Sequence, residues 1–188
     1  MVRQHQAASG PLSRWFDVSS VTEGGTTFRV VASAAERQAV AIDCGLPGID
    51  ALAAAFLVAR EVPDGARVTG SVTARIRQIC VLSLDEFESD LDEPVDLRFA
   101  SEAEIEAQIA ARAARPIPDE SDDGDLPDPI RRGRIDLGAL MAEILVLGLD
   151  PYPRKPGVTF AEPAASVPDE PKASPFAMLR NLKSAGDA

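Results

Sequence analysis

Side chains that could act as nucleophiles, general bases or metal ligands are few in this chain. Cysteine occurs twice, at Cys44 and Cys80, and the only histidine is His5 in a polar N-terminal segment. A structural zinc site needs four ligands, and two thiolates with one distant imidazole do not supply them. Carboxylates are plentiful, but no Gly-rich phosphate loop or other catalytic motif accompanies them. We therefore expect no catalytic residue, no metal and no other cofactor, and we do not expect an enzyme.

Two interpretations of Cys80 remain open. Its position in an alternating segment places it with Val72 and Ile76 on the apolar side, which favours a buried structural thiol. The alternative is a reactive thiol in a cysteine-dependent enzyme. Because the sequence shows no signal peptide and no apolar run long enough to span a bilayer, we expect a reduced cytoplasmic setting without membrane contact.

Basic side chains occur in two sets that could contact RNA phosphates. The first set lies on the polar side of one expected strand: Arg67, Arg75 and Arg77. The second set flanks one expected helix: Arg131, Arg132, Arg134, Arg154 and Lys155. If the loops at the helix ends fold back, the second set would form a single patch. A solvated surface is the alternative for both sets, and no aromatic residue alternates with the strand arginines to stack bases.

Acidic residues outnumber basic ones, and the formal net charge is −11. Thirteen of the 30 acids lie in two runs without Lys or Arg, at residues 85–96 and 119–128, and the remaining 17 acids face 19 bases. A charge of this sign argues against indiscriminate binding to polyanions. The acidic runs indicate solvated surface or, alternatively, a surface that holds basic proteins.

The strand arginines belong to the clearest periodic segment of the chain, at residues 67–80. Apolar and small residues alternate there with polar ones, interrupted by Gln78, and residues 87–99 repeat the pattern. A period of two is typical of half-buried β-strands. Residues 51–60, followed by Pro63-Asp64-Gly65, are expected to form the antiparallel partner of the first strand.

Two capping boxes and one apolar stripe predict the helices. Ser33 with Glu36 should begin a helix that ends near Cys44. Ser101 with Glu104 should begin another that runs through Arg112. Asp136 is a candidate N-cap for a leucine-rich helix over 137–149, which we expect to lie on the sheet. Residues 12–18 and 26–31, separated by Glu23-Gly24-Gly25, indicate a first β-hairpin.

These elements predict an α+β fold with a mainly antiparallel sheet of five to seven strands, curled toward a barrel, and two or three packing helices. Residues 11–153 should form one domain containing an acidic mobile loop at 116–129. Residues 1–10 should be a disordered tail, residues 154–174 a Pro-rich linker, and residues 175–183 a short amphipathic helix.

Three blocks of the chain together resemble the YceD family of large ribosomal RNA subunit accumulation proteins. They are residues 72–87 with Cys80, residues 133–143 running into Leu149-Asp-Pro-Tyr-Pro-Arg-Lys-Pro156, and the terminal residues 174–183. Some members carry Cys-x-x-Cys, a pair that can begin a tetrahedral zinc site, where this chain has Cys80-Val-Leu-Ser83. Ser83 takes the place of the second cysteine, which supports the expectation of no zinc. The resemblance implies a bacterial cytoplasmic protein without enzymatic activity that supports accumulation and processing of 23S rRNA.

The leading hypothesis is therefore a ribosome biogenesis factor that associates directly or indirectly with ribosomal RNA or a pre-50S particle. The alternative is an acidic adaptor that binds basic ribosomal proteins and never contacts RNA. Composition alone indicates no more than an acidic α+β domain.

Overall fold

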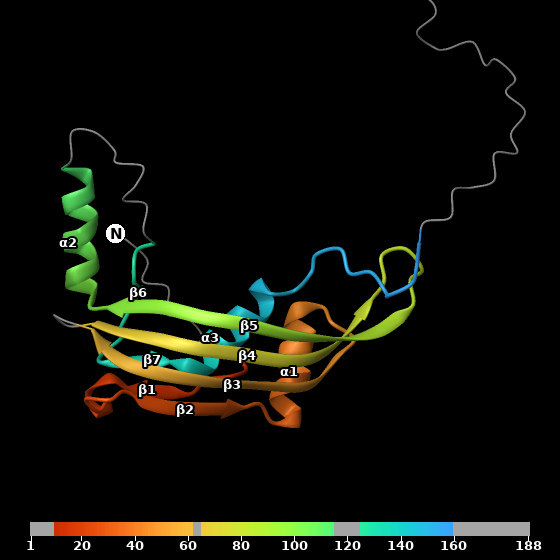
Figure 1. The fold of residues 1–188 in the computed structure, drawn as a ribbon, viewed down its shortest axis with the longest axis horizontal. Helices are drawn as coiled ribbons and strands as arrows, with labels where there is room; N and C mark the ends of the chain where they lie inside the picture. Colours follow the sequence, from red (N-terminus) through yellow and green to blue (C-terminus); the bar gives the residue numbers. More distant parts are fainter. Residues whose placement is uncertain (1–9, 62–64, 115–124, 160–188) are drawn as a thin grey trace, which may run out of the picture. The chain divides into compact units, whose positions relative to one another are not determined.

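Three consecutive strands form the centre of this computed structural model, which describes residues 10–61, 65–114 and 125–159. They are β3 (Gly48–Glu61), β4 (Gly65–Ile79) and β5 (Glu86–Ala100), and they pair in antiparallel order. Figure 1 shows them as long neighbouring ribbons. The expected pairing of residues 51–60 with the first strand is confirmed, because Ala51 lies opposite Arg75 and Ala59 opposite Arg67.

The alternation along β4 separates a buried side from an exposed one, as the sequence predicts. Val68 and Val72 are fully buried and Ile76 is 2% exposed. The interruption at Gln78 has a structural explanation: its side chain is buried, and its Oε1 accepts a hydrogen bond of 2.9 Å from Ser89 Oγ on β5. A buried amide with a partner avoids the desolvation cost that an unpaired polar group would incur.

Five strands make up the main sheet, in the order β2-β3-β4-β5-β6. β2 (Thr26–Val31) pairs antiparallel with β3, and β6 (Asp128–Pro129) pairs parallel with β5. The α+β class and the mainly antiparallel sheet are confirmed. The expected curling toward a barrel is not realised as closure, because β2 and β6 lie at opposite edges and do not pair with each other in the part of the chain described.

The predicted first hairpin is wrong. β1 (Trp15–Asp17) pairs with β7 (Arg134–Asp136) in a separate two-stranded sheet, while β2 pairs with β3. After β1 the chain turns through the 3-10 helix Val18–Ser20, where the Asp17 carboxylate accepts the Ser19 N–H at 2.8 Å. The Gly24-Gly25 segment does form a turn, but β1 buries Phe16 by pairing with a strand far along the chain.

Both predicted N-caps, Ser33 and Ser101, begin helices where expected, and the complete capping box is present at Ser33. α1 (Ala34–Cys44) starts with both reciprocal bonds between Ser33 and Glu36, and Gly45 ends it in the left-handed conformation at φ 67°. α2 (Glu102–Ala113) begins after Ser101, whose hydroxyl accepts the Glu104 N–H. α1 packs on β3, whereas α2 buries none of its side chains, so two helices cover the sheet.

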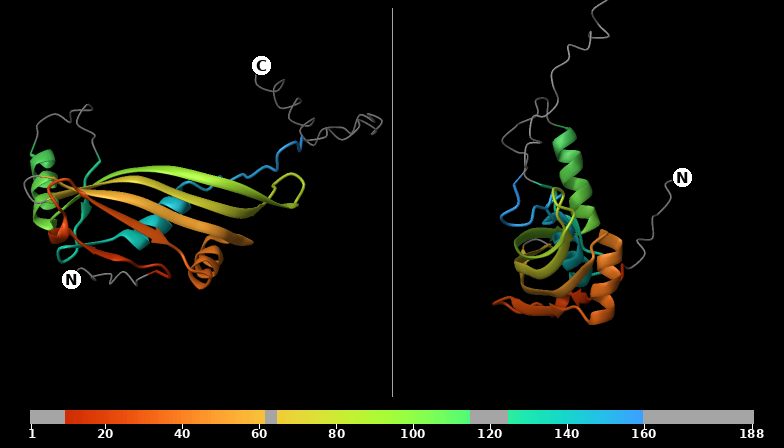
Figure 2. Two further views of the ribbon diagram at one scale, coloured as in Figure 1. Left: turned by 60° about the horizontal axis from the view of Figure 1, so that its bottom comes forward. Right: turned by 90° about the vertical axis from the view of Figure 1, so that its right-hand side faces the viewer.

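α3 (Leu137–Leu147) is the leucine-rich helix that the sequence places on the sheet, and it contacts β4 and β5. Figure 2 shows it running along one side of the long strands. It ends two residues earlier than expected, with Gly148 as its C-cap. The side chains that it buries recur at helical spacing: Leu137, Leu140, Met141 and Leu145.

Predictions for the chain ends fall outside the described residues. The tail before Gly10, the linker after Thr159 and the helix at 175–183 all lie in undescribed segments. Of the loop at 116–129, residues 125–129 are described, and its last two residues form β6 rather than loop.

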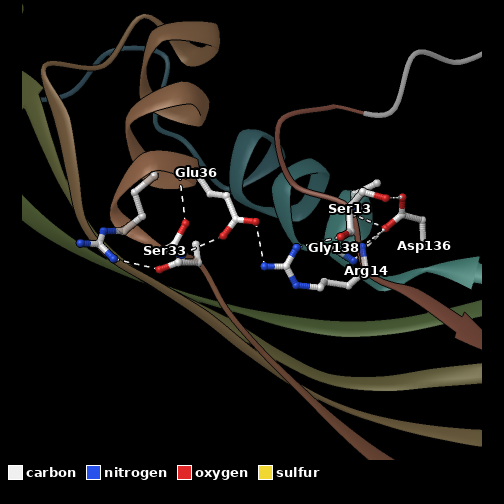
Figure 3. A network of polar contacts seen from close by, with 9 residues as sticks. Ser13, Arg14, Ser33, Glu36, Asp136 and Gly138 are labelled. Carbon is white, nitrogen blue, oxygen red and sulfur yellow. Dashed lines mark hydrogen bonds and ion pairs between the residues drawn. The ribbon is translucent and has the colours of Figure 1, made fainter.

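A polar network joins the segment before β1 to the first turns of α1 and α3 (Figure 3). Arg14 Nη2 donates to Glu36 Oε1 at 2.7 Å, and Glu36 Oε2 accepts the Ser33 N–H at 2.8 Å. These bonds hold the pKa of Glu36 at about 2, well below its ordinary value of 4.5. The bond from the Ser33 N–H lowers this pKa the most. Glu36 therefore stabilises the fold most when it is ionised.

Glu36 should make stability depend on pH on the acid side. Because its pKa is lower in the folded state, its contribution is fully present above about pH 4.5 and is lost as pH falls toward about 2. The substitution Glu36→Gln should lower stability at neutral pH and flatten this acid-side decline. Urea unfolding between pH 2 and 7 measures both effects. Glu23→Gln, at an exposed turn, is the control, and an unchanged pH profile in Glu36→Gln would contradict the assignment.

Two leucines of α3 offer a matched test of its packing. Leu145 is fully buried and Leu147 is 74% exposed. Leu145→Ala should lower the free energy of unfolding by about 2–5 kcal/mol, because it leaves a cavity against the sheet. Leu147→Ala should change it by less than about 0.5 kcal/mol. Denaturant unfolding of both variants measures this, and similar losses would show that α3 is not held by this face.

Candidate nucleic-acid interface

The candidate RNA-contacting arginines of β4 are paired with acids of neighbouring strands. Arg67 makes a bidentate contact to Asp96 on β5, with both N–O distances at 2.6 Å, and Arg75 Nε lies 2.9 Å from Asp90 Oδ1. The Arg67 guanidinium holds the pKa of Asp96 below its usual range through this hydrogen bond. Each of these guanidinium groups already faces a carboxylate.

Arg77 lies between two acids. Its Nη1 is 3.2 Å from Glu86 Oε1, and its Nε is 3.5 Å from Asp50 Oδ1. The Nε is buried and makes no hydrogen bond, so its attraction to Asp50 is that of an ion pair alone. Arg98 on β5 likewise pairs with Glu61. The exposed side of β4 and β5 is therefore a surface of alternating positive and negative charge. Such a surface attracts a polyanion far less than three unpaired arginines would.

The arginines before α3 are arranged differently. Arg131 and Arg134 exchange two backbone hydrogen bonds of 3.0 Å across a two-residue turn, in which Arg132 has φ 52° and Gly133 has φ 75°. Positive φ at both central positions defines a type I′ turn. The turn places two arginines directly opposite each other, which is unfavourable for like charges. It also puts a non-glycine residue in a left-handed conformation.

Asp136 connects this turn to β1 and to α3. One of its carboxylate oxygens accepts the N–H groups of Gly138 and Ala139 at 3.1 Å each, as the N-cap of the helix. The carboxylate also accepts the Arg14 N–H at 2.7 Å and the Ser13 hydroxyl at 2.6 Å (Figure 3). The strand β1 is thereby held beside β7, with Trp15 opposite Asp136.

Trp15 consequently lies beside the turn formed by residues 131–134, which we call the arginine turn. The guanidinium carbon of Arg134 is 5.3 Å from the centroid of the Trp15 ring, and the residue is 45% exposed. A guanidinium at this distance is attracted to the ring face. Arg131 and Arg132 make no ion pair with any described residue, in contrast to the arginines of β4.

A cleft of about 340 Å³ opens beside Trp15 and the arginine turn, at the N-terminal end of α3. We call this region the corner before α3. Its lining combines the ring of Trp15 with Arg131 and Arg134, the apolar side chains of Phe99 and Leu140, and three acids. The acids are Asp128, Asp136 and Glu143. Partial burial raises the pKa of Asp128 above its usual value. The cleft thus offers cationic donors, carboxylate acceptors and an aromatic surface within one small volume.

Arg154 and Lys155 do not join this corner. They follow the opposite end of α3, which is about 16 Å long at 1.5 Å per residue. There the Pro153 carbonyl accepts the Val81 N–H at 2.9 Å, and Lys155 Nζ lies 3.4 Å from Asp85 Oδ2. Arg154 lines a separate hollow of about 290 Å³. The single patch considered for the second basic set is therefore divided into two sites.

The expected burial of Cys80 is confirmed, since its residue exposure is 0%. Hydrogen bonds from Ser83 to the sulfur, chiefly that of the hydroxyl, lower the pKa of Cys80 to about 7. Burial and the neighbouring Asp43 raise the pKa of Cys44. Nowhere among the described residues do three or more His, Cys, Asp or Glu side chains gather as a metal site would require.

Sequence reasoning missed Trp15, Asp128 and Glu143 as members of a site. Trp15 lies 116 residues from Arg131, so no local spacing connects them. Glu143 was one polar residue in an apolar helix, and Asp128 was one acid of an acidic run. The available signal was the three arginines around Gly133, which face no compensating acid within two positions except Asp136.

Fold and site together define an α+β protein with an open, mainly antiparallel sheet, a charge-balanced sheet face and a cleft lined by Trp15, Arg131 and Arg134. None of the described helices has the length and hydropathy that crossing a bilayer requires. On β4 and β5 the ion pairs leave a face that is balanced in charge rather than broadly basic.

Residues 68–183 match the model of one protein family, described as Large ribosomal RNA subunit accumulation protein YceD. The match covers more than half of the chain, from β4 past α3, and the chain belongs to the YceD family. No curated protein and no solved structure matches it. The family resemblance inferred from the three sequence blocks is confirmed.

Asp136 should be needed to assemble the corner. Asp136→Ala removes the acceptor of four hydrogen bonds and should lower the free energy of unfolding by about 1–3 kcal/mol. Because the chain contains one tryptophan, loss of β1 docking should also shift the fluorescence of Trp15 in the native state. Asp92→Ala, at an exposed position of β5 outside the cleft, is the control. An unchanged Trp15 spectrum in Asp136→Ala would show that the carboxylate does not position the ring.

Proposed function

We propose that this chain is a non-enzymatic ribosome biogenesis factor that acts in the bacterial cytoplasm. It supports the accumulation of 23S rRNA by associating with RNA of the assembling large subunit. The observation that carries this proposal is membership in the YceD family, whose description names large ribosomal RNA subunit accumulation.

RNA contact through the corner before α3 is supported by the contrast between its arginines and those of β4. Arg131 and Arg132 make no ion pair with a described residue, and Arg131 lies directly opposite Arg134, which is unfavourable for like charges. Departures from local rules of this kind are typical of functional sites. Three arginines would release few counterions, so the logarithm of affinity for single-stranded RNA should fall with the logarithm of salt with a slope of about −2.

A second candidate function is an adaptor for basic ribosomal proteins. It is favoured by the net charge of −11 and by the exposed acids of β5. In this case the protein would stabilise the large subunit through protein contacts, and neutralising the arginines would have little effect.

Depletion of the protein should lower 23S rRNA and the ratio of large to small subunits, measured by rRNA profiling and sucrose gradients. An unchanged level of large-subunit rRNA after depletion would contradict the proposed function. Complementation then separates the two mechanisms. Arg131→Gln with Arg132→Gln should reduce crosslinks to rRNA and weaken rescue, because it removes unpaired charge.

The matched control, Arg67→Gln with Arg75→Gln, also removes two positive charges but from existing ion pairs. It should rescue as wild type, since exposed pairs contribute about 0–1 kcal/mol each to stability. Equal rescue by both double variants, with ribosomal proteins but no RNA recovered by crosslinking, would favour the adaptor.

A further inference from the structure

The cleft beside Trp15 is assembled from parts of the chain that are far apart in the sequence. Its lining side chains come from β1, β5, β6, the arginine turn and α3, which meet only in the folded protein. Its volume of about 340 Å³ lies at the lower end of the usual range of small-ligand sites, about 300–1,000 Å³. A base with part of its ribose fits this volume, whereas a nucleic-acid duplex does not.

The residues of the cleft match the chemistry of an unpaired base. Single-stranded RNA is read by stacking on aromatic rings or arginine planes and by hydrogen bonds to base edges. Arg134 already lies over the Trp15 ring, with its guanidinium carbon 5.3 Å from the ring centroid, and the tryptophan is 45% exposed. Arg131 and Arg132 on the turn would meet the flanking phosphates.

Carboxylates within the cleft indicate which base is preferred. When ionised, Asp128 and Glu143 can accept hydrogen bonds but cannot donate them, so they select a base edge that presents N–H donors. Guanine presents a ring N–H beside an amino group, which one carboxylate can accept together. Uracil presents one N–H between two carbonyl oxygens, which would face the carboxylate with like charge.

We propose that the cleft between β1, β6 and α3 binds a guanine base of single-stranded RNA, stacked against the Trp15–Arg134 pair with its donor edge toward Asp128 and Glu143. This inference rests on the proposed function, because it names the RNA element that the same corner recognises.

Tryptophan fluorescence provides a direct test, because Trp15 is the only tryptophan of the chain. The full-length protein is titrated with a short uridine-rich RNA that contains one central guanosine. Emission should be quenched saturably. The same strand with an abasic central position, or annealed into a duplex, should bind at least tenfold more weakly. Equal quenching by the abasic strand or by the duplex would overturn the proposal.

Variants separate stacking from charge, with affinity measured by anisotropy of labelled RNA. Trp15→Leu should weaken binding about 5- to 150-fold, the range for loss of one stacked base, whereas Trp15→Phe should retain most of it. Asp128→Asn should reduce the preference for guanosine over uridine. Arg29→Gln, an exposed arginine of β2 outside the cleft, is the charge control and should bind as wild type.

Three further outcomes decide between this site and its rivals. Equal binding by Trp15→Leu and wild type would overturn the cleft as the RNA site, while an rRNA defect on depletion would leave the proposed function standing. Binding at the cleft without any such defect would support the site and reject the function. Quenching by an arginine-rich peptide but not by RNA would overturn the proposal and favour a ribosomal-protein ligand.

Discussion

The carboxylate of Asp136 is the constraint on which the arrangement of this protein's candidate site depends. It accepts four hydrogen bonds at once, from the first turn of α3 and from the two residues that precede β1. The N–H of Leu137 donates back to the Arg14 carbonyl at 2.9 Å, so the connection is reciprocal. Because a helix N-terminus needs acceptors, one residue both starts α3 and anchors the N-terminal strand beside it. Trp15 reaches Arg134 for this reason.

Electrostatics then divides the arginines into two kinds. Along β4 each guanidinium has an acid of β3 or β5 within ion-pair distance, and the face is balanced despite its several arginines. At the turn before α3, Arg131 and Arg134 lie opposite each other, and Arg134 is partnered by the Trp15 ring rather than by a carboxylate. For a chain with a net charge of −11, such a confined basic site permits local contact with RNA without attraction over the whole surface.

The family match begins at Val68, but the fold requires the residues before it. β3 supplies one neighbour of β4 from Gly65 to Arg77, and β1 supplies the Trp15 ring of the cleft. Members of a family can share the core of a site while the residues around it differ between chains. The cleft therefore combines a family-matched part, from β5 to α3, with Trp15 from outside the matched region.

Much of the local structure could be derived from the sequence. Three features depend only on residues a few positions apart, so their pattern is visible in the sequence. They are the alternation of β4, the N-caps at Ser33, Ser101 and Asp136, and the burial of Cys80. The pattern interruption at Gln78 was also visible, although its partner Ser89 was not.

Only the tertiary structure decided which strands and charges meet. The turn signal at Gly24-Gly25 predicted a hairpin, and a turn does form there. The strand before it, however, pairs with β7, where Phe16 lies opposite Ile135. Pairing with a distant strand buries the Phe16 side chain as well as a hairpin would. Whether an arginine is neutralised depends on the acid placed across the sheet by strand register, as for Arg67 and Asp96. Long-range pairing and register carry no local signature, so the sequence predicted the candidate arginines but not the cleft that distinguishes them.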